Sequence, residues 1–406
     1  MFCRSIKSLD TRHQLHWKLL IYMNYASPFM KPALLREQAV SLLLSAAVIL
    51  SMSGCASRPG ADVLSSVSVK GDQTKLVTVY AATTRSRQSA DANVFTTGRS
   101  RELNYARFDM SIPPDHKDSN IEWPKGKPNP RTDFVVANQS MLSADGFQKD
   151  MKAERRHRTV GIFVHGYNYN FQESLFRLAQ MASDSDIDSV PILFSWPSQG
   201  TLTGYVADRE AVLYSRDYLQ QLILSVSRDK DNGQILLFGH SMGSMLIMET
   251  LRQLKLEGRQ DVLSRLRVVL AAPDIDVDVF RTQLQVIGKM SPPMTILVSS
   301  DDRALYASSI LDADNSRVGR LDINDPKIRD AAIKGGVQIV DISALKTTDT
   351  FRHDRYASLA KLGPELSALG RPDAKNPVGR VGAFVLDAAS NTITAPFRLA
   401  SKVINP

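Results

Sequence analysis

One stretch decides the fold of this chain: Gly233-Gln-Ile-Leu-Leu-Phe-Gly239-His-Ser241-Met-Gly243, followed by Ser-Met-Leu-Ile-Met-Glu-Thr-Leu-Arg-Gln-Leu. An apolar run of strand length, Ile235–Phe238, enters the pattern Gly-x-Ser-x-Gly, and a periodic helix follows it. This context is a nucleophile elbow, a tight strand-to-helix turn that lifts a serine hydroxyl above a sheet. Glycine fits at 239 and 243 because the backbones approach too closely there for a Cβ atom. Ser241 is therefore the candidate nucleophile.

Strand-like and helix-like segments alternate around this stretch. Continuous apolar strands separated by amphipathic helices are typical of a mostly parallel sheet with helices on both faces, so an α/β fold is expected. Right-handed crossovers place the carboxyl ends of the parallel strands at one edge, where ligand sites of open α/β sheets collect. The expected strands are Lys75–Ala82, Tyr105–Ile112, Asp133–Ala137, Thr159–His165, Pro191–Trp196, Ile235–Phe238, Val268–Ala272, Thr295–Ser299 and Val337–Ile342, and the clearest helices are Phe171–Ser183 and Asp208–Ser227.

A serine at an elbow needs a base, and the base needs a carboxylate that fixes its tautomer. The chain order that accompanies this elbow is serine, then acid, then histidine. His353 is the only histidine after Ser241, so elimination makes it the expected base. The competing interpretation is a surface histidine in Phe-Arg-His-Asp-Arg-Tyr.

Three aspartates that follow expected strands are candidates for the acid. Asp302 is favoured, because Asp-Arg-Ala-Leu is typical of a helix start with an acid in its first turn. Asp301 and Asp274 are the alternatives. Capping of a helix is the other role open to each of them.

The developing oxyanion needs two hydrogen-bond donors. The backbone N–H of Met242, the residue after the serine, is one. The second is expected in the loop after the first parallel strand, His165-Gly166-Tyr167-Asn168, and we assign it to the N–H of Tyr167. This chemistry needs no metal and no organic cofactor.

The motifs together resemble the α/β-hydrolase superfamily, and more closely a bacterial branch of α/β hydrolases of unknown function. The resemblance runs from about residue 75 to about 360 and implies a Ser-Asp-His hydrolase of esters or related acyl bonds, without naming a substrate. The segments that carry it are Ile162–Asn168, Phe194–Ser198, Tyr205–Glu210, Gly239–Gly243, Leu270–Asp276 and Ser300–Leu305.

The N-terminal segment has the pattern of a secretory signal. Lys31 and Arg36 precede an apolar stretch, and small residues precede Cys55. The ending Ser-Gly-Cys resembles the bacterial lipoprotein signal, in which Cys55 would be lipidated and hold the protein on a membrane. A retained signal anchor is the alternative, although the apolar run is short for a span of about 20 residues. Met30 begins a conventional signal and is the expected start. Ala56 is not the aspartate that favours retention in the inner membrane, so a periplasm-facing envelope lipoprotein is expected, on the outer membrane if the host is Gram-negative.

The expected organisation is a signal segment 1–54, a linker 55–72, a hydrolase domain 73–361 and a C-terminal extension 362–406 of uncertain order. Apolar residues at helical spacing predict a packing helix within 381–389. Without residues 1–54 the formal net charge falls from +8 to +4, which argues against a nucleic-acid partner. Beyond Cys55 there is no cysteine, which excludes disulfides and thiolate chemistry from the mature chain.

The substrate is constrained only by loop length. The 22 residues from Pro273 to Met294 are too few for a cap domain, so an open site is expected, with the stretch Trp196–Asp208 as a loop over it. Such a site suits a short acyl chain or a bulky substrate that reaches in from solvent. Two other functions compete: a non-catalytic envelope lipoprotein that uses the fold for binding, and a transacylase or amidase acting on a lipid or cell-wall component.

Overall fold

The computed structural model describes residues 58–69, 74–154, 159–185, 189–229, 234–312, 315–347, 349–362, 386–387 and 392–393. The chain divides into two compact units, Met1–Arg58 and Pro59–Pro406, and every element below belongs to the second. The signal segment 1–54, Met30 and Cys55 lie outside the described residues, as does most of the extension beyond 362. None of the helices in the described part of the chain combines the length and the apolarity that a membrane span requires.

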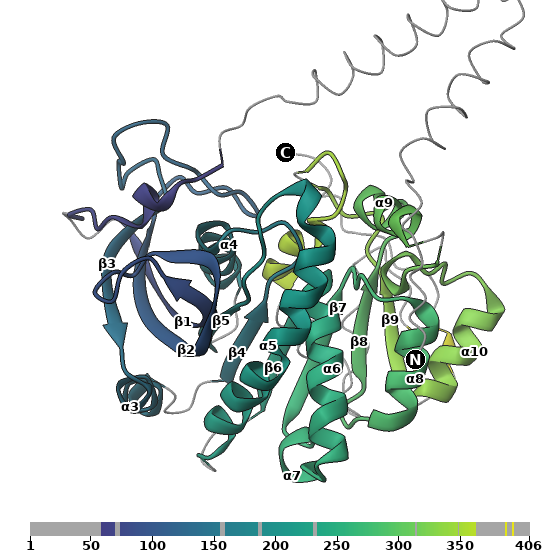
Figure 1. Cartoon of the computed structure of the whole chain (residues 1–406). Coiled ribbons are helices and arrows are strands. Elements are labelled where there is room, and N and C mark those ends of the chain that lie inside the picture. Colours follow the sequence, from purple (N-terminus) through teal and green to yellow (C-terminus); the bar gives the residue numbers. More distant parts are fainter. Residues whose placement is uncertain are drawn as a thin grey trace, which may run out of the picture. The chain divides into compact units, whose positions relative to one another are not determined.

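Nine of the described strands form one sheet in the order β3-β2-β1-β5-β4-β6-β7-β8-β9 (Figure 1). From β1 to β9 the neighbours in this order are parallel, while β2 and β3 continue the sheet as antiparallel strands. The strands are β1 (Lys75–Arg87), β2 (Phe95–Ile112), β3 (Val135–Leu142), β4 (Thr159–Val164), β5 (Ser189–Ser195), β6 (Ile235–His240), β7 (Leu266–Ala271), β8 (Met294–Val298) and β9 (Val337–Asp341).

Helices cover both faces of this sheet (Figure 1). The helices are α3 (Ala144–Glu154), α4 (Phe171–Asp184), α5 (Tyr205–Ser227), α6 (Met242–Leu256), α7 (Gln260–Leu263), α8 (Val277–Ile287), α9 (Arg303–Leu311) and α10 (Pro326–Gly335), with short 3₁₀ turns η1 (Ala61–Leu64), η2 (Leu202–Gly204), η3 (Val318–Arg320) and η4 (Arg355–Leu362).

Alternate residues of the strands feed two apolar cores. On β4, Ile162 and Val164 pack with α5, α6 and α8, whereas Phe163 packs on the opposite face with α4 and η4. This alternation follows from the period of two along a strand and gives every parallel strand two buried faces. The predicted α/β-hydrolase fold, a mostly parallel sheet with helices on both faces, is confirmed.

The expected bounds of three strands are wrong: β3 is Val135–Leu142 rather than Asp133–Ala137, and β1 and β2 are longer than expected. β1 continues to Arg87 and β2 begins at Phe95, so both strands extend well past the apolar runs that predicted them. Their outer halves pair with each other through the backbone, which requires no apolar side chains. The packing helix expected within 381–389 is contradicted at two of its residues. Leu386–Asp387 form the strand β10, which pairs antiparallel with β11 (Thr392–Ile393).

Candidate active site

Ser241 lies at the turn between β6 and α6 in a strained backbone conformation. Its φ is +53° and its ψ is −121°. Such geometry in a non-glycine residue costs about 1–3 kcal/mol and persists only where the surroundings hold it. Here the Ser241 N–H donates to the Ala271 carbonyl at 2.9 Å, and the Asp274 N–H donates to the Ser241 carbonyl at 3.3 Å. The neighbouring strand β7 therefore holds the turn.

The two glycines of the elbow occupy positions without room for a side chain. A Cβ on Gly243 would lie 2.3 Å from the Val164 carbonyl oxygen and 2.5 Å from that of His165. A Cβ on Gly239 would lie 2.9 Å from the Cα of Ser244. These clashes are with backbone, which cannot rotate away. Gly243 is therefore required by the approach of α6 to the end of β4, and Gly239 by the approach of α6 to β6.

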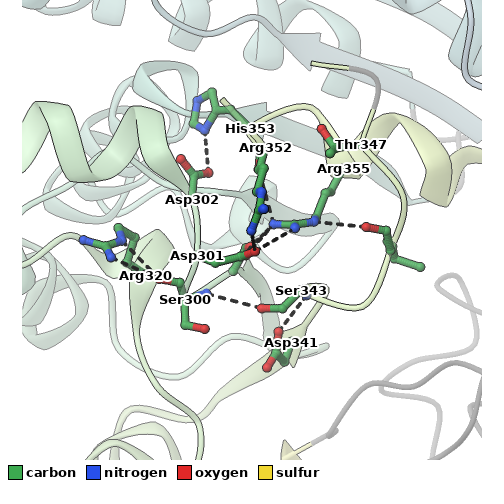
Figure 2. Close-up of polar contacts among 12 residues, drawn as sticks. Ser300, Asp301, Asp302, Arg320, Asp341, Ser343, Thr347, Arg352, His353 and Arg355 are labelled. Atoms are coloured by element: carbon green, nitrogen blue, oxygen red, sulfur yellow. Dashed lines mark hydrogen bonds and ion pairs between the residues drawn. The ribbon is translucent and has the colours of Figure 1, made fainter. Parts of the chain in front are cut away.

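His353 is held by a carboxylate at the end of the neighbouring strand β8. Its Nδ1 lies 2.6 Å from Oδ2 of Asp302 (Figure 2). Asp302 is 1% exposed, and its Oδ1 also accepts the Leu305 N–H at 2.9 Å, which caps α9. An ionised carboxylate only accepts hydrogen bonds, so Nδ1 carries the proton and Nε2 is the basic nitrogen of the neutral ring.

The backbone of His353 is fixed from two sides as well. Its N–H donates to Oδ1 of Asp349 at 2.9 Å, and its carbonyl lies 3.2 Å from Nε2 of His240. Burial lowers the pKa of His353, but the negative charges of Asp302, Asp349 and Asp274 outweigh it, so the pKa is raised above 6.5. His240 has the opposite balance: burial and the nearby His353 push its pKa well below 6.5.

The two alternative acids have other partners. Asp301 accepts hydrogen bonds from Arg352 at 2.6 Å, from Arg355 at 2.6 and 3.0 Å and from the Ser299 hydroxyl at 2.8 Å (Figure 2). Burial raises the pKa of Asp301, but these hydrogen bonds outweigh it and hold the pKa well below the usual range. The sequence favoured Asp302 but left Asp301 open, because the arginines and the histidine that distinguish them lie about fifty positions further along the chain.

Asp274 belongs to a different buried cluster. Its carboxylate accepts from the hydroxyls of Ser308 at 2.6 Å and Tyr205 at 3.1 Å, and it pairs with Arg317 at 3.2 Å. Of the three candidate acids, Asp302 is the one within hydrogen-bonding distance of His353.

The two segments expected to donate to an oxyanion both border the elbow. Met242 is the first residue of α6, where a backbone N–H has no partner within the helix. The loop after β4 presses against the serine, since a Cβ on Gly166 would lie 2.9 Å from the Cβ of Ser241. The hydroxyl of the next residue, Tyr167, bonds to the carbonyls of Thr201 and Leu202 at 3.2 and 2.5 Å.

Ser241 is less exposed than an open site would suggest. The connection between β7 and β8 contains α8 and no cap domain, as expected. Ser241 is nevertheless only 3% exposed. The bonds from Tyr167 tie the segment at Thr201 and Leu202 to the loop beside the serine, and Leu202 itself is 70% exposed.

A buried polar network behind the loop after β4 was missed by sequence reasoning. His165 is fully buried, stacks on Trp196 with ring centroids 4.9 Å apart, and lies 3.1 Å from the Ser195 hydroxyl. Burial, together with Arg85, lowers the pKa of His165 to about 3, so the ring is neutral. Arg85 donates to that hydroxyl at 3.0 Å and to the Tyr169 carbonyl at 2.9 Å.

Asp208, at the start of α5, supports the same loop. It accepts from the Ser198 hydroxyl at 2.6 Å, from the Gln199 N–H at 2.7 Å and from the Asn168 N–H at 3.4 Å. Ser198 and Asp208 stand in motifs that carried the resemblance, which was the one available signal. No sequence signal pointed to Arg85, because an arginine at the end of a strand is expected to be exposed.

No group of three or more His, Cys, Asp or Glu side chains in the described part of the chain could hold a metal ion.

Comparison with known protein families identifies the family to which the chain belongs. A family model described as alpha/beta hydrolase of unknown function (DUF900) matches residues 142–369, more than half of the chain. The chain belongs to this family. The match includes Ser241, Asp302 and His353 and begins at the last residue of β3, so β1 and β2 precede it. The resemblance stated from the motifs is thereby confirmed at the level of the family.

This α/β hydrolase is also similar to an uncharacterized protein of Nostoc sp. (strain PCC 7120), with 30% identity over 134 residues. The match covers 27% of this chain and 34% of the relative. It therefore spans about a third of the relative's length.

Proposed function

We propose that this α/β hydrolase is a serine hydrolase that cleaves carboxylic esters or related acyl bonds. The observation that carries the proposal is the contact of 2.6 Å between His353 Nδ1 and Asp302 Oδ2. In addition, Ser241 occupies a strained strand-to-helix turn that follows β6, at the edge of the sheet where Asp302 follows β8. Nucleophile, base and acid also follow one another in the order that accompanies such an elbow.

Each residue has a defined role in the proposed reaction. The Ser241 hydroxyl attacks the acyl carbonyl while Nε2 of His353 takes its proton. Asp302 fixes the tautomer of His353 and stabilises the imidazolium that forms. The N–H groups of Met242 and Tyr167 donate to the oxyanion. His353 then protonates the leaving group, and water, deprotonated by the same ring, hydrolyses the acyl-enzyme.

The acyl acceptor is the open part of this proposal. A triad of this kind also serves amide cleavage and acyl transfer, because the pocket walls select the leaving group and the acceptor. Turnover of an ester that yields a new ester or amide rather than the free acid would assign the protein to the transferases. A wild-type protein that binds acyl compounds without turnover would make it a binding protein.

The function is tested with a panel of p-nitrophenyl esters of increasing chain length. We expect turnover of short-chain esters by the wild type and only background hydrolysis by Ser241→Ala. Ser264→Ala is the matched control, because it removes an exposed serine hydroxyl remote from the elbow. Equal activity in Ser241→Ala and the wild type would contradict the proposal, and preference for long-chain emulsions would contradict the expectation of a short acyl chain.

A further inference from the structure

Asp301 forms an ionic clamp beside the proposed base. The clamp consists of Asp301, Arg352 and Arg355, and its two arginines flank His353 in the sequence (Figure 2). Asp301 itself precedes Asp302, the partner of His353. The neighbouring carboxylates of one turn therefore bind two parts of one loop: Asp302 binds the imidazole, and Asp301 binds the residues on either side of it.

The turn that carries both aspartates is anchored independently of this clamp. The Ser300 N–H donates to the Ser343 hydroxyl at 3.3 Å, and the Ser300 carbonyl accepts from Arg320 at 3.1 Å. The Ser299 N–H donates to the Gly319 carbonyl at 2.8 Å. The turn is thus a fixed frame, to which the loop with His353 is tied.

The loop that carries His353 needs such a tie. Arg352 has a φ of +58°, a conformation that costs energy in any residue with a side chain and persists only where its surroundings hold it. One backbone bond, from the Arg303 N–H to the Phe351 carbonyl at 2.9 Å, joins the loop to α9. Arg355 is 5% exposed and also donates to the Leu345 carbonyl at 3.0 Å, so its guanidinium is fixed in place.

We infer that Asp301 is a positioning residue for His353. It holds His353 against Asp302, and it neutralises the positive charges of the two arginines that flank His353. This inference rests on the proposed function, since it assigns Asp301 a role in the same reaction. Without Asp301, Arg352 and Arg355, which lie one and two positions from His353, would lose the carboxylate that pairs with both. The charged groups that act on His353 are Asp302, Asp349 and Asp274, and the ring of His240 lies against its own. Its loop also carries Arg352, Asp354, Arg355 and Tyr356, of which the two arginines pair with Asp301. Beyond these lie Tyr169, Arg177 and His165, which act on Tyr356 or His240.

Two substitutions separate positioning from mere folding, because they change the local charge in opposite directions. Asp301→Asn removes a negative charge and lowers the pKa of His353, so the acid limb of kcat/KM moves to lower pH. Arg352→Gln removes a positive charge and moves the same limb to higher pH. Each shift is on the order of a few tenths of a pH unit at low salt and smaller at high salt. If Asp301→Asn fails to fold because it leaves the buried Arg355 unpaired, Arg352→Gln still tests the inference: the Arg352 side chain is 41% exposed, and Asp301 keeps its pairing with Arg355.

The experiment measures kcat, KM and the pH profile of ester hydrolysis for the full chain, with active sites counted by fluorophosphonate titration. We expect kcat per active site to fall roughly tenfold or more in both variants, with KM changed less than about twofold. Asp278→Asn is the matched control, because it breaks an exposed ion pair with Arg281 that touches no part of the clamp.

Two results would overturn the inference. One is a pair of variants with wild-type kcat per active site and a wild-type pH profile. The other is a shift of the acid limb in the same direction in both variants, because opposite changes of charge cannot produce it. Failure of the proposed function is distinguishable from failure of this inference. It would appear as a wild type without Ser241-dependent turnover, which is measured before any clamp variant is compared.

Discussion

At the scale of single residues, the chemistry depends on which of two adjacent carboxylates meets His353. The sequence predicted an aspartate after β8 and favoured Asp302, and the structure places Asp302 against the imidazole and Asp301 against two arginines. Residue type and chain order were enough to single out one serine and one histidine as candidates. They were not enough for the choice between neighbours, which depends on the directions of two side chains at one turn.

The contact between Asp302 and His353 has a pH signature. The proposed base must be neutral, so kcat/KM falls as the pH drops through the pKa of His353. That pKa is raised, because the carboxylates around the ring outweigh its burial, and the fall therefore begins at a higher pH than for a histidine with the ordinary value of 6.5. In Asp302→Asn we expect the acid limb to move to lower pH and kcat/KM to drop roughly a thousandfold or more.

This prediction is checked by pH–rate profiles of the wild type and Asp302→Asn on one ester. Asp312→Asn is a suitable control, because it removes a carboxylate at the end of α9 that pairs with Arg317 and Arg209 rather than with His353. An unchanged acid limb in Asp302→Asn would show that the carboxylate does not act on the base.

At the scale of elements, the elbow is where local sequence and tertiary packing agree most closely. The motif predicted a strand, a turn and a helix, and β6 and α6 lie as expected. The strand ends were predicted less well, because the outer halves of β1 and β2 are polar and pair only with each other. The buried Arg85 was missed for the same reason: its partners come from β5 and from the loop before α4, which no local pattern shows.

Packing of α6 against β4 makes a prediction about Gly243. A methyl group there would meet two backbone carbonyl oxygens within 2.5 Å, so Gly243→Ala must push α6 away from β4. We expect a loss of about 3 kcal/mol in the free energy of unfolding together with loss of activity. Chemical denaturation of the variant measures this loss.

Gly126→Ala is the matched control for that measurement, since a Cβ at Gly126 would meet no atom within 4 Å. A Gly243→Ala variant as stable as this control would show that the helix and the strand are further apart than described.

At the scale of the whole molecule, the sheet gathers residues from distant parts of the chain at one edge. Ser241 follows β6, Asp302 follows β8, and His353 lies beyond β9, because parallel strands joined by helices end on the same side. The fold class was predictable from the alternation of apolar runs and helices. The low exposure of Ser241 was not, because it depends on how loops from distant parts of the chain pack around the elbow.

We also propose that the protein is exported and held on a membrane by a lipid on Cys55. Met30, Lys31 and the apolar stretch before Cys55 support this proposal from the sequence. In a bacterial host fed with labelled palmitate, we expect incorporation into the wild type and none into Cys55→Ser, which should leave the membrane fraction. Equal labelling of the two proteins would contradict lipidation at this residue.

Covalent labelling by a fluorophosphonate tests whether Ser241 is a nucleophile that His353 and Asp302 activate. Peptide mapping by mass spectrometry of the labelled protein locates the adduct, and the labelling rate is compared across Ser241→Ala, His353→Ala and the wild type. We expect one adduct, on the peptide that contains Ser241, with no labelling of Ser241→Ala and much slower labelling of His353→Ala. An adduct on another residue, or a labelling rate that does not change when His353 is removed, would contradict this prediction.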